Sequence, residues 1–235
     1  GQERFPHLAD MFPVADGDTG TNMALTLRSA VMGANSAKTN DLFDVANSIA
    51  LHSLRGAQGN SGVILSQYFK GIAEYIERRN RLYLPDVAGA FSAGADSAYK
   101  AVRDPKEGTI LTVLREIAEH LQQMKPRLDS LSHLMESAIE RGRLSLENTR
   151  HRLKVLSDAN VVDAGGEGFI HFIEGINTFI KTGELPKDTL LLSVEGDLPK
   201  VMEEVSKFRF CTEFLVNGKS FDTDAIRNSL QNLGD

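Results

Sequence analysis

Hydrophobic residues recur at helical spacing along most of the first 180 residues. Three stretches show this most clearly, because their apolar side chains lie three or four positions apart and would share one face of a helix. The stripes are Leu65, Phe69, Ile72 and Ile76; Ile110, Leu114, Ile117 and Leu121; and Phe169, Ile173, Ile176 and Ile180. Further helices are expected at about 23–34, 41–56, 85–103 and 129–149. The joints between these segments are short and polar or glycine-containing, which is typical of antiparallel neighbours.

The pattern changes after residue 182. Residues 189–196, TLLLSVEG, and 208–218, FRFCTEFLVNG, are rich in β-branched and aromatic residues and predict strands. Residues 222–235 predict one more helix. Two strands and a helix are too few for an independent core. We therefore expect an all-α domain at 1–182, a linker at 183–207, and the start of an incomplete middle α/β domain at 208–235.

The bulk composition is ordinary for a globular protein, with 235 residues, 41% hydrophobic and 25% charged. A net charge of −6 argues against nucleic acid as a partner, although it leaves room for a local anion site. No apolar run is long enough to span a membrane, so no integral membrane segment is expected. The single cysteine, Cys211, excludes an intrachain disulfide and fits a reducing compartment, so we expect a cytoplasmic protein.

Three aspartates near the start form the pattern D-x5-D-x-D, namely Asp10, Asp16 and Asp18 in and before FPVADGDTGTNM (12–23). Carboxylates are ligands that Mg²⁺ prefers, and a loop folded at Gly17 would bring the last two together. Asp18 could also cap the helix that follows, where backbone N–H groups would suit a phosphate.

Three other interpretations compete for this stretch. An EF-hand counted from Asp16 would need an oxygen ligand, a glycine and a glutamate where Gly20, Thr21 and Leu27 stand, so it fails. A phosphotransferase of the haloacid dehalogenase type would place its first aspartate after a buried strand, and FPVA is short and broken by proline. The remaining alternative is a solvated turn with an aspartate cap.

Three further glycine-bearing segments lead into helices. They are RGAQGNSGVILSQ (55–67), DPKEGTILTV (104–113) and VVDAGGEGF (161–169). In the first, Asn60 and Ser61 could cap the helix, and the absence of G-K-[ST] excludes a Walker A loop. If neighbouring helices alternate in direction, these starts would gather at one end of the bundle beside the aspartates, as a Mg²⁺-nucleotide requires. Each segment alone is also a plausible helix–helix turn.

In this order and at this spacing, the four segments resemble the nucleotide-binding L domain of dihydroxyacetone kinases (DhaL). The resemblance is closer still to the kinase subunit of bacterial fatty acid kinase, and it covers about residues 8–182. It implies an up-and-down antiparallel barrel of about eight helices, the first of which would precede residue 1. FRFCTEF is similar to the start of the middle domain that follows in the fatty acid kinase subunit.

The resemblance also implies the cofactors and the site. ATP or ADP would lie at one end of the barrel, with Mg²⁺ held by Asp10, Asp16 and Asp18, and Asp16 and Asp18 acting as the catalytic residues. Thr19 stands where dihydroxyacetone kinases often have histidine, which favours the fatty acid branch. The positions that match the motifs around the nucleotide are Thr19, Gly20, Thr21, Asn22, Asn60, Ser61, Gly62, Gly108, Thr109 and Asp163.

The implied activity is transfer of the γ-phosphoryl group of ATP to a fatty acid carboxylate, giving acyl-phosphate. A DegV-like acyl-binding protein, separate or fused, would present that acceptor. Since a carboxylate is already an anion, we nominate none of the six histidines as a general base. A dihydroxyacetone-type kinase and a non-catalytic ADP-binding module remain alternatives. The sequence leaves the oligomeric state open, with a homodimer among the possibilities.

Overall fold

The computed structural model describes residues 17–77, 79, 81–125, 129–184 and 222–230. The chain divides into two compact units, Gly1–Pro199 and Lys200–Asp235. The predicted strands at 189–196 and 208–218, and Cys211, lie outside the described residues. The domain boundaries expected from the sequence stay predictions.

The described part of the first unit is helical, which confirms the all-α fold. Each helix expected from the sequence is present, together with a six-residue helix, α7, that is too short to show a repeating pattern in the sequence. The helices are α1 (Thr19–Asn35), α2 (Leu42–Arg55), α3 (Gly59–Glu77), α4 (Leu84–Ala101), α5 (Ile110–Met124), α6 (Leu131–Arg152), α7 (Lys154–Ala159) and α8 (Ala164–Thr182).

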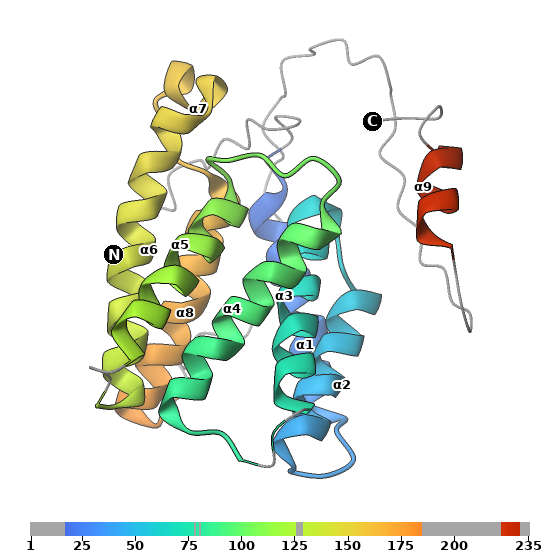
Figure 1. The fold of residues 1–235 in the computed structure, drawn as a ribbon, viewed down its shortest axis with the longest axis vertical. Helices are drawn as coiled ribbons and strands as arrows, with labels where there is room; N and C mark the ends of the chain where they lie inside the picture. Colours follow the sequence, from blue (N-terminus) through green and yellow to red (C-terminus); the bar gives the residue numbers. More distant parts are fainter. Residues whose placement is uncertain (1–16, 78, 80, 126–128, 185–221, 231–235) are drawn as a thin grey trace. The chain divides into compact units, whose positions relative to one another are not determined.

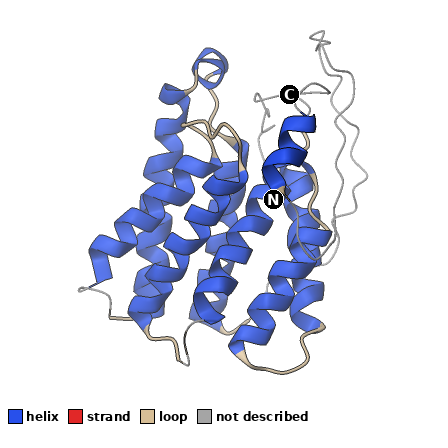
Figure 2. Ribbon diagram, turned by 45° about the vertical axis from the view of Figure 1, so that its right-hand side comes forward, coloured by secondary structure: helices blue, strands red, loops and turns tan. Residues whose placement is uncertain are grey.

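The long helices run alternately up and down and close into a ring (Figure 1). Each of α1 to α5 packs against the next helix in the chain, α6 packs against α8, and α8 contacts α1. Additional contacts join α1 to α3 and α5 to α8. Figure 2 shows the same helices as an antiparallel array. The short helix α7 lies in the connection between α6 and α8. The first and last long helices, α1 and α8, therefore run in the same direction, and they meet side by side.

Aromatic side chains from several helices fill the middle of the ring. Tyr68 of α3 lies edge-on to Phe169 of α8, with ring centroids 5.1 Å apart, and to Phe91 of α4 at 6.2 Å. Gly94 makes room for this ring, since a Cβ there would lie 2.7 Å from two atoms of Tyr68. The sequence-predicted stripes face this core: Leu65, Ile117, Leu121, Phe169 and Ile173 are fully buried.

Side chains close the helix starts at the lower end of the bundle in Figure 1, where α2, α4 and α6 begin. The Asp41 carboxylate accepts the N–H of Phe43 at 2.9 Å, and the Ser130 hydroxyl accepts that of His133 at 3.1 Å. Asp86 accepts the N–H of Tyr83 at 2.8 Å. Such caps satisfy N–H groups that have no acceptor within the helix.

In the second unit, the described residues form α9 (Thr223–Leu230), which confirms the helix predicted at the end of the chain. The Asp222 carboxylate accepts the N–H of Ala225 at 2.9 Å at its start. Among the helices that the structure describes in either unit, none has the length and apolar character needed to cross a membrane.

The Tyr68 hydroxyl is fully buried and has no hydrogen-bond partner among the described residues. A buried polar group without a partner costs free energy, so Tyr68→Phe should raise the free energy of unfolding by about 1 kcal/mol. Tyr68→Ala should lower it by about 3–5 kcal/mol, because a cavity would open in the aromatic core. Urea denaturation measures both, and a Phe variant less stable than the wild type would show that the hydroxyl has a partner.

Candidate functional site

Four helices, α1, α3, α5 and α8, begin at the upper end of the bundle in Figure 1. These are the four helices that follow the motif segments identified in the sequence. A helix start carries backbone N–H groups without intrahelical acceptors and the positive end of the helix dipole. The alternating direction of the helices therefore places four such starts on one face of the molecule.

The starts of α1 and α3 are in direct contact. Gly59, with φ of +59°, opens α3 directly against the amide of Asn22, where a Cβ would clash. One turn further on, Gly62 packs against the Thr26 hydroxyl. That hydroxyl donates to the Asn22 carbonyl at 2.8 Å and accepts the N–H of Gln58 at 3.3 Å. Thr26 thus ties the turn before α3 to the second turn of α1.

The start of α8 lies between α1 and α5. A Cβ on Gly168 would be 2.9 Å from the sulfur of Met23 on α1. A Cβ on Gly165 would be 3.2 Å from the Cβ of Ile110, the first residue of α5. The two glycines therefore allow close approach on both sides, and the four starts follow one another in the order α3, α1, α8, α5.

Asp18 occupies the N-cap position of α1, with φ −103° and ψ −8°. The expectation that its side chain caps the helix is wrong, because the carboxylate makes no capping hydrogen bond in this backbone conformation. Its carbonyl accepts the N–H of Asn22 at 2.8 Å. The carboxylate is partly buried and makes no hydrogen bond or ion pair with the residues that the structure describes. Asp10 and Asp16 lie outside those residues.

The other predicted positions on α1 and α3 fall in the first turn of each helix. Thr19, Gly20 and Thr21 form the start of α1, with Gly20 and Thr21 exposed. The expectation that Asn60 and Ser61 cap α3 is wrong, because the helix begins at Gly59 and both residues lie inside its first turn. Within the described ranges, no group of three or more His, Cys, Asp or Glu residues could hold a metal ion.

Asp163 is the N-cap of α8, and its carboxylate accepts the N–H of Gly166 at 2.7 Å. Its own N–H donates to the Thr149 hydroxyl of α6 at 3.1 Å. Thr149 is fully buried and donates to the Leu146 carbonyl at 2.6 Å. Asp163, predicted from the motif as a nucleotide contact, therefore fixes the start of α8 on α6.

Gly108 and Thr109 form the turn that opens α5. Gly108 is buried with φ of +88°, and Thr109 is the N-cap, its hydroxyl donating to the Lys106 carbonyl at 2.8 Å. The N–H of Gly108 donates to the Thr112 hydroxyl at 2.8 Å. That hydroxyl donates in turn to Glu107 at 2.8 Å. The backbone of the turn is therefore held by side chains on either side of it.

Glu107 is the centre of a polar cluster that the sequence does not reveal. Its carboxylate accepts from Tyr99 at 3.0 Å, from Arg115 at 2.7 Å and from Arg152 at 3.2 Å. Burial raises the pKa of Glu107, but the hydrogen bonds from Thr112, Tyr99 and Arg115 outweigh it and hold the pKa below its ordinary value. The hydrogen bond from Arg115 to Tyr99 is the main reason that the pKa of Arg115 is raised. The position of Glu107 next to Gly108 in the sequence could have drawn attention to this glutamate. Nothing in the sequence pairs it with Arg152.

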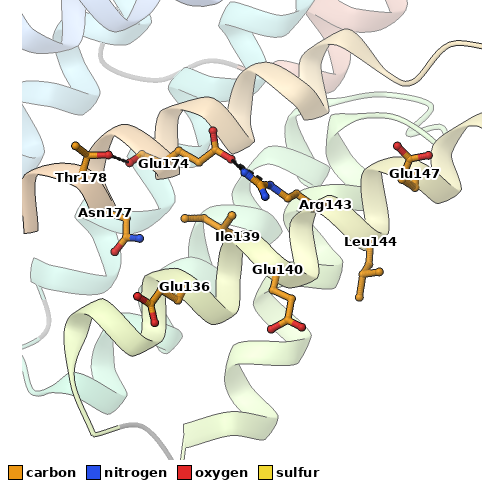
Figure 3. A pocket seen from close by; sticks show the side chains of 9 residues that line it. All are labelled: Glu136, Ile139, Glu140, Arg143, Leu144, Glu147, Glu174, Asn177 and Thr178. Atoms are coloured by element: carbon orange, nitrogen blue, oxygen red, sulfur yellow. Dashed lines mark hydrogen bonds and ion pairs between the residues drawn. The ribbon is translucent and has the colours of Figure 1, made fainter. Parts of the chain in front are cut away.

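A groove of about 570 Å³ lies elsewhere, on the outer side of α6 and α8 (Figure 3). None of the predicted site residues lines it. Most of its charges are already paired: Arg143 bonds Glu174 at 2.6 Å, and Lys181 bonds Glu136 at 2.6 Å. The groove is therefore separate from the helix starts. Its lining consists of Glu136, Ile139, Glu140, Arg143, Leu144, Glu147, Glu174, Asn177 and Thr178.

The arrangement defines an all-α domain whose long helices present glycine-bearing starts at one end, a geometry suited to binding an anion. The chain matches the model of the DAK2 domain over residues 13–178. It belongs to this family, which confirms the DhaL-type resemblance and relates the chain to the kinases that contain such a domain.

Curated relatives share this sequence over most of the chain. It is 36% identical over 239 residues to "Protein YloV" of Bacillus subtilis (strain 168). It is 37% identical over 240 residues to "Uncharacterized protein SH1689" of Staphylococcus haemolyticus (strain JCSC1435). Each alignment covers 96% of this chain and 43% of the relative. The chain thus spans less than half the length of these relatives.

The turn at Gly108 should be intolerant of a side chain. Gly108→Ala would place a Cβ in the left-handed region, 2.9 Å from the Cβ of Arg152 and 3.0 Å from Leu153. We expect the free energy of unfolding to fall by about 2 kcal/mol in urea denaturation. The matched control is Gly175→Ala in α8, where a Cβ would meet nothing within 4 Å beyond the local backbone of its own helix. It should raise stability by up to about 1 kcal/mol through helix propensity. Equal effects of the two changes would contradict the assigned backbone geometry.

Proposed function

We propose that this chain is the nucleotide-binding kinase domain of a fatty acid kinase. It would transfer the γ-phosphoryl group of ATP to a fatty acid carboxylate that a DegV-like protein or fused domain presents, giving acyl-phosphate. Membership of the DAK2 family supports the kinase-related class. The acyl acceptor and the DegV-like partner rest on the motif resemblance, in particular on Thr19 in place of histidine.

One observation carries the proposal: the Asp18 carboxylate makes no bond within the described part of the chain, although it lies among the gathered helix starts. The three helix starts at the other end are all closed by their own side chains, Asp41, Asp86 and Ser130. At the start of α1, the carboxylate that could cap the helix does not do so. Asp18 is therefore available to a ligand in a way that the aspartates of the opposite end are not.

The residues that the motifs identify would suit a nucleotide with a hard cation. Asp10, Asp16 and Asp18 would supply carboxylate oxygens, which Mg²⁺ prefers over nitrogen or sulfur ligands. The first N–H groups of α1 and α3, around Thr19–Asn22 and Asn60–Gly62, would bind phosphate oxygens. When bound, Mg²⁺ and ATP supply the phosphoryl group and neutralise its charge. The domain itself then contributes positioning, by holding two helix starts together through Asn22 and Thr26.

The acceptor requires no base from this chain. A fatty acid carboxylate is ionised near neutral pH, so it has no proton to lose before it attacks phosphorus. Two histidines within the helices are engaged in other contacts: His52 Nδ1 lies 2.9 Å from the Ser48 carbonyl, and His171 Nδ1 lies 3.0 Å from Glu174. That no histidine serves as general base stays a prediction.

Asp18→Ala should abolish Mg-ATP-dependent formation of acyl-phosphate from a fatty acid loaded on a DegV-like protein. The loss should exceed about a hundredfold, because a metal ligand would be removed from the transferring phosphate. Circular dichroism should show an unchanged fold, since the carboxylate makes no bond among the described residues. Asp16→Ala is expected to behave in the same way.

The matched control is Asp96→Ala, which removes an exposed carboxylate from α4 and should leave the rate unchanged. Wild-type rates in the Asp18 variant would refute the metal assignment. Transfer to dihydroxyacetone instead of the fatty acid would favour the glycerone-type kinase. Tight ADP binding with no transfer to either acceptor would identify a non-catalytic module.

A further inference from the structure

Arg152, the last residue of α6, bonds two carboxylates, one of which is buried and the other exposed. Its Nη2 donates to Glu116 on α5 at 2.6 Å, and its Nη1 donates to Glu107 at 3.2 Å. The Glu116 side chain is only 5% exposed, and Arg141 donates to its second oxygen at 2.7 Å. A buried carboxylate with an arginine on each oxygen is held firmly in place, because losing either arginine would leave charge unpaired in the interior.

Glu107 connects this buried carboxylate to the start of α5. The same Oε2 that accepts from Arg152 also accepts from the Thr112 hydroxyl at 2.8 Å. Since that proton is committed to Glu107, a lone pair of the hydroxyl accepts the N–H of Gly108, also at 2.8 Å. The path from the buried Glu116 to the backbone of Gly108 is therefore continuous, and every step in it is a hydrogen bond.

The last turn of α6 also packs against the turn at Gly108. The position of a Cβ on Gly108 lies 2.9 Å from the Cβ of Arg152 and 3.3 Å from the Thr149 carbonyl. The left-handed φ of Gly108 brings the chain this close and then directs it into α5. Arg152 thus contacts the turn through its Cβ and holds it through its guanidinium.

We propose that Arg152 is a positioning residue for the nucleotide, acting through Glu107 and Thr112 on the Gly108–Thr109 turn. It fixes the direction in which the first N–H groups of α5 point, and so the donors that this helix offers to phosphate oxygens. This inference rests on the proposed function. Lysine cannot replace Arg152, because a single ammonium group lacks the planar fork that reaches both carboxylates.

The test compares Arg152→Lys with Arg143→Lys. Arg143 lies on the same helix, nine residues before Arg152, and forms an ion pair with Glu174 (Figure 3). Amide hydrogen exchange in the nucleotide-free protein should accelerate about tenfold or more over residues 107–113 in Arg152→Lys alone. Calorimetric titration with Mg-ADP should show about tenfold weaker binding in the same variant, the loss expected for one charge-assisted hydrogen bond. Arg152→Lys should also lower the thermal unfolding midpoint more than Arg143→Lys does, because its partner Glu116 is buried.

A second variant, Glu107→Gln, keeps the Arg152–Glu116 bridge and removes the carboxylate charge through which Arg152 reaches the turn, a charge that Arg115 and Tyr99 also bond. It should reproduce the exchange and binding changes even if Arg152→Lys does not fold. Unchanged exchange over residues 107–113 in the folded variants would overturn the proposal. So would faster exchange with undiminished Mg-ADP affinity. Absence of Mg-ADP binding in the wild type would instead refute the proposed function, and the nucleotide role of Arg152 with it.

Discussion

Closure of the helical ring by α1 against α8 is the constraint on which the rest of the structure depends. An odd number of long helices in alternating directions leaves the first and the last parallel, so closing the ring brings their starts together. Gly168 allows a close approach at this contact, where a Cβ would lie 2.9 Å from the sulfur of Met23. The starts of α3 and α5 then lie on either side of this pair. The gathering of helix starts follows from topology and from a few glycines at the contacts.

The two ends of the bundle differ in how their helix starts are satisfied. At one end, Asp41 and Ser130 cap the helices that they precede, and Asp86 in the first turn of α4 accepts the N–H of Tyr83. At the other end, Asp163 caps α8 in the same way, but contacts between helices contribute as well: Thr26 accepts the N–H of Gln58 before α3, and Thr149 accepts the N–H of Asp163. The turn before α5 depends on a still longer path, through Thr112 and Glu107 to the buried Glu116. Rigid supports of this kind hold the backbone of a loop in place while leaving the N–H donors at the loop surface available to a ligand.

Much of this fold could be predicted from the sequence, because the apolar stripes that begin at Leu65, Ile110 and Phe169 do face the core. The missing parts have physical reasons. The sequence favours Asn60 as a cap of α3, yet the helix already begins at Gly59, whose left-handed φ cannot be read from composition. Of the candidate site, the sequence identifies the glycine-bearing starts and Asp18. It could not identify the pairing of Glu107 with Arg152, since partners 45 residues apart leave no periodic pattern.

The absorbance of the buried Tyr68 ring can report whether the domain is folded. The sequence contains no tryptophan and four tyrosines, so tyrosine dominates the near-ultraviolet absorbance. Burial raises the pKa of Tyr68, so its phenol stays protonated in the folded state when an exposed tyrosine would ionise, near pH 10. Stability is therefore lost as the pH rises above that value, because only the unfolded chain releases this proton. In an alkaline titration, the phenolate absorbance that appears after the exposed tyrosines have ionised then reports the opening of the aromatic core.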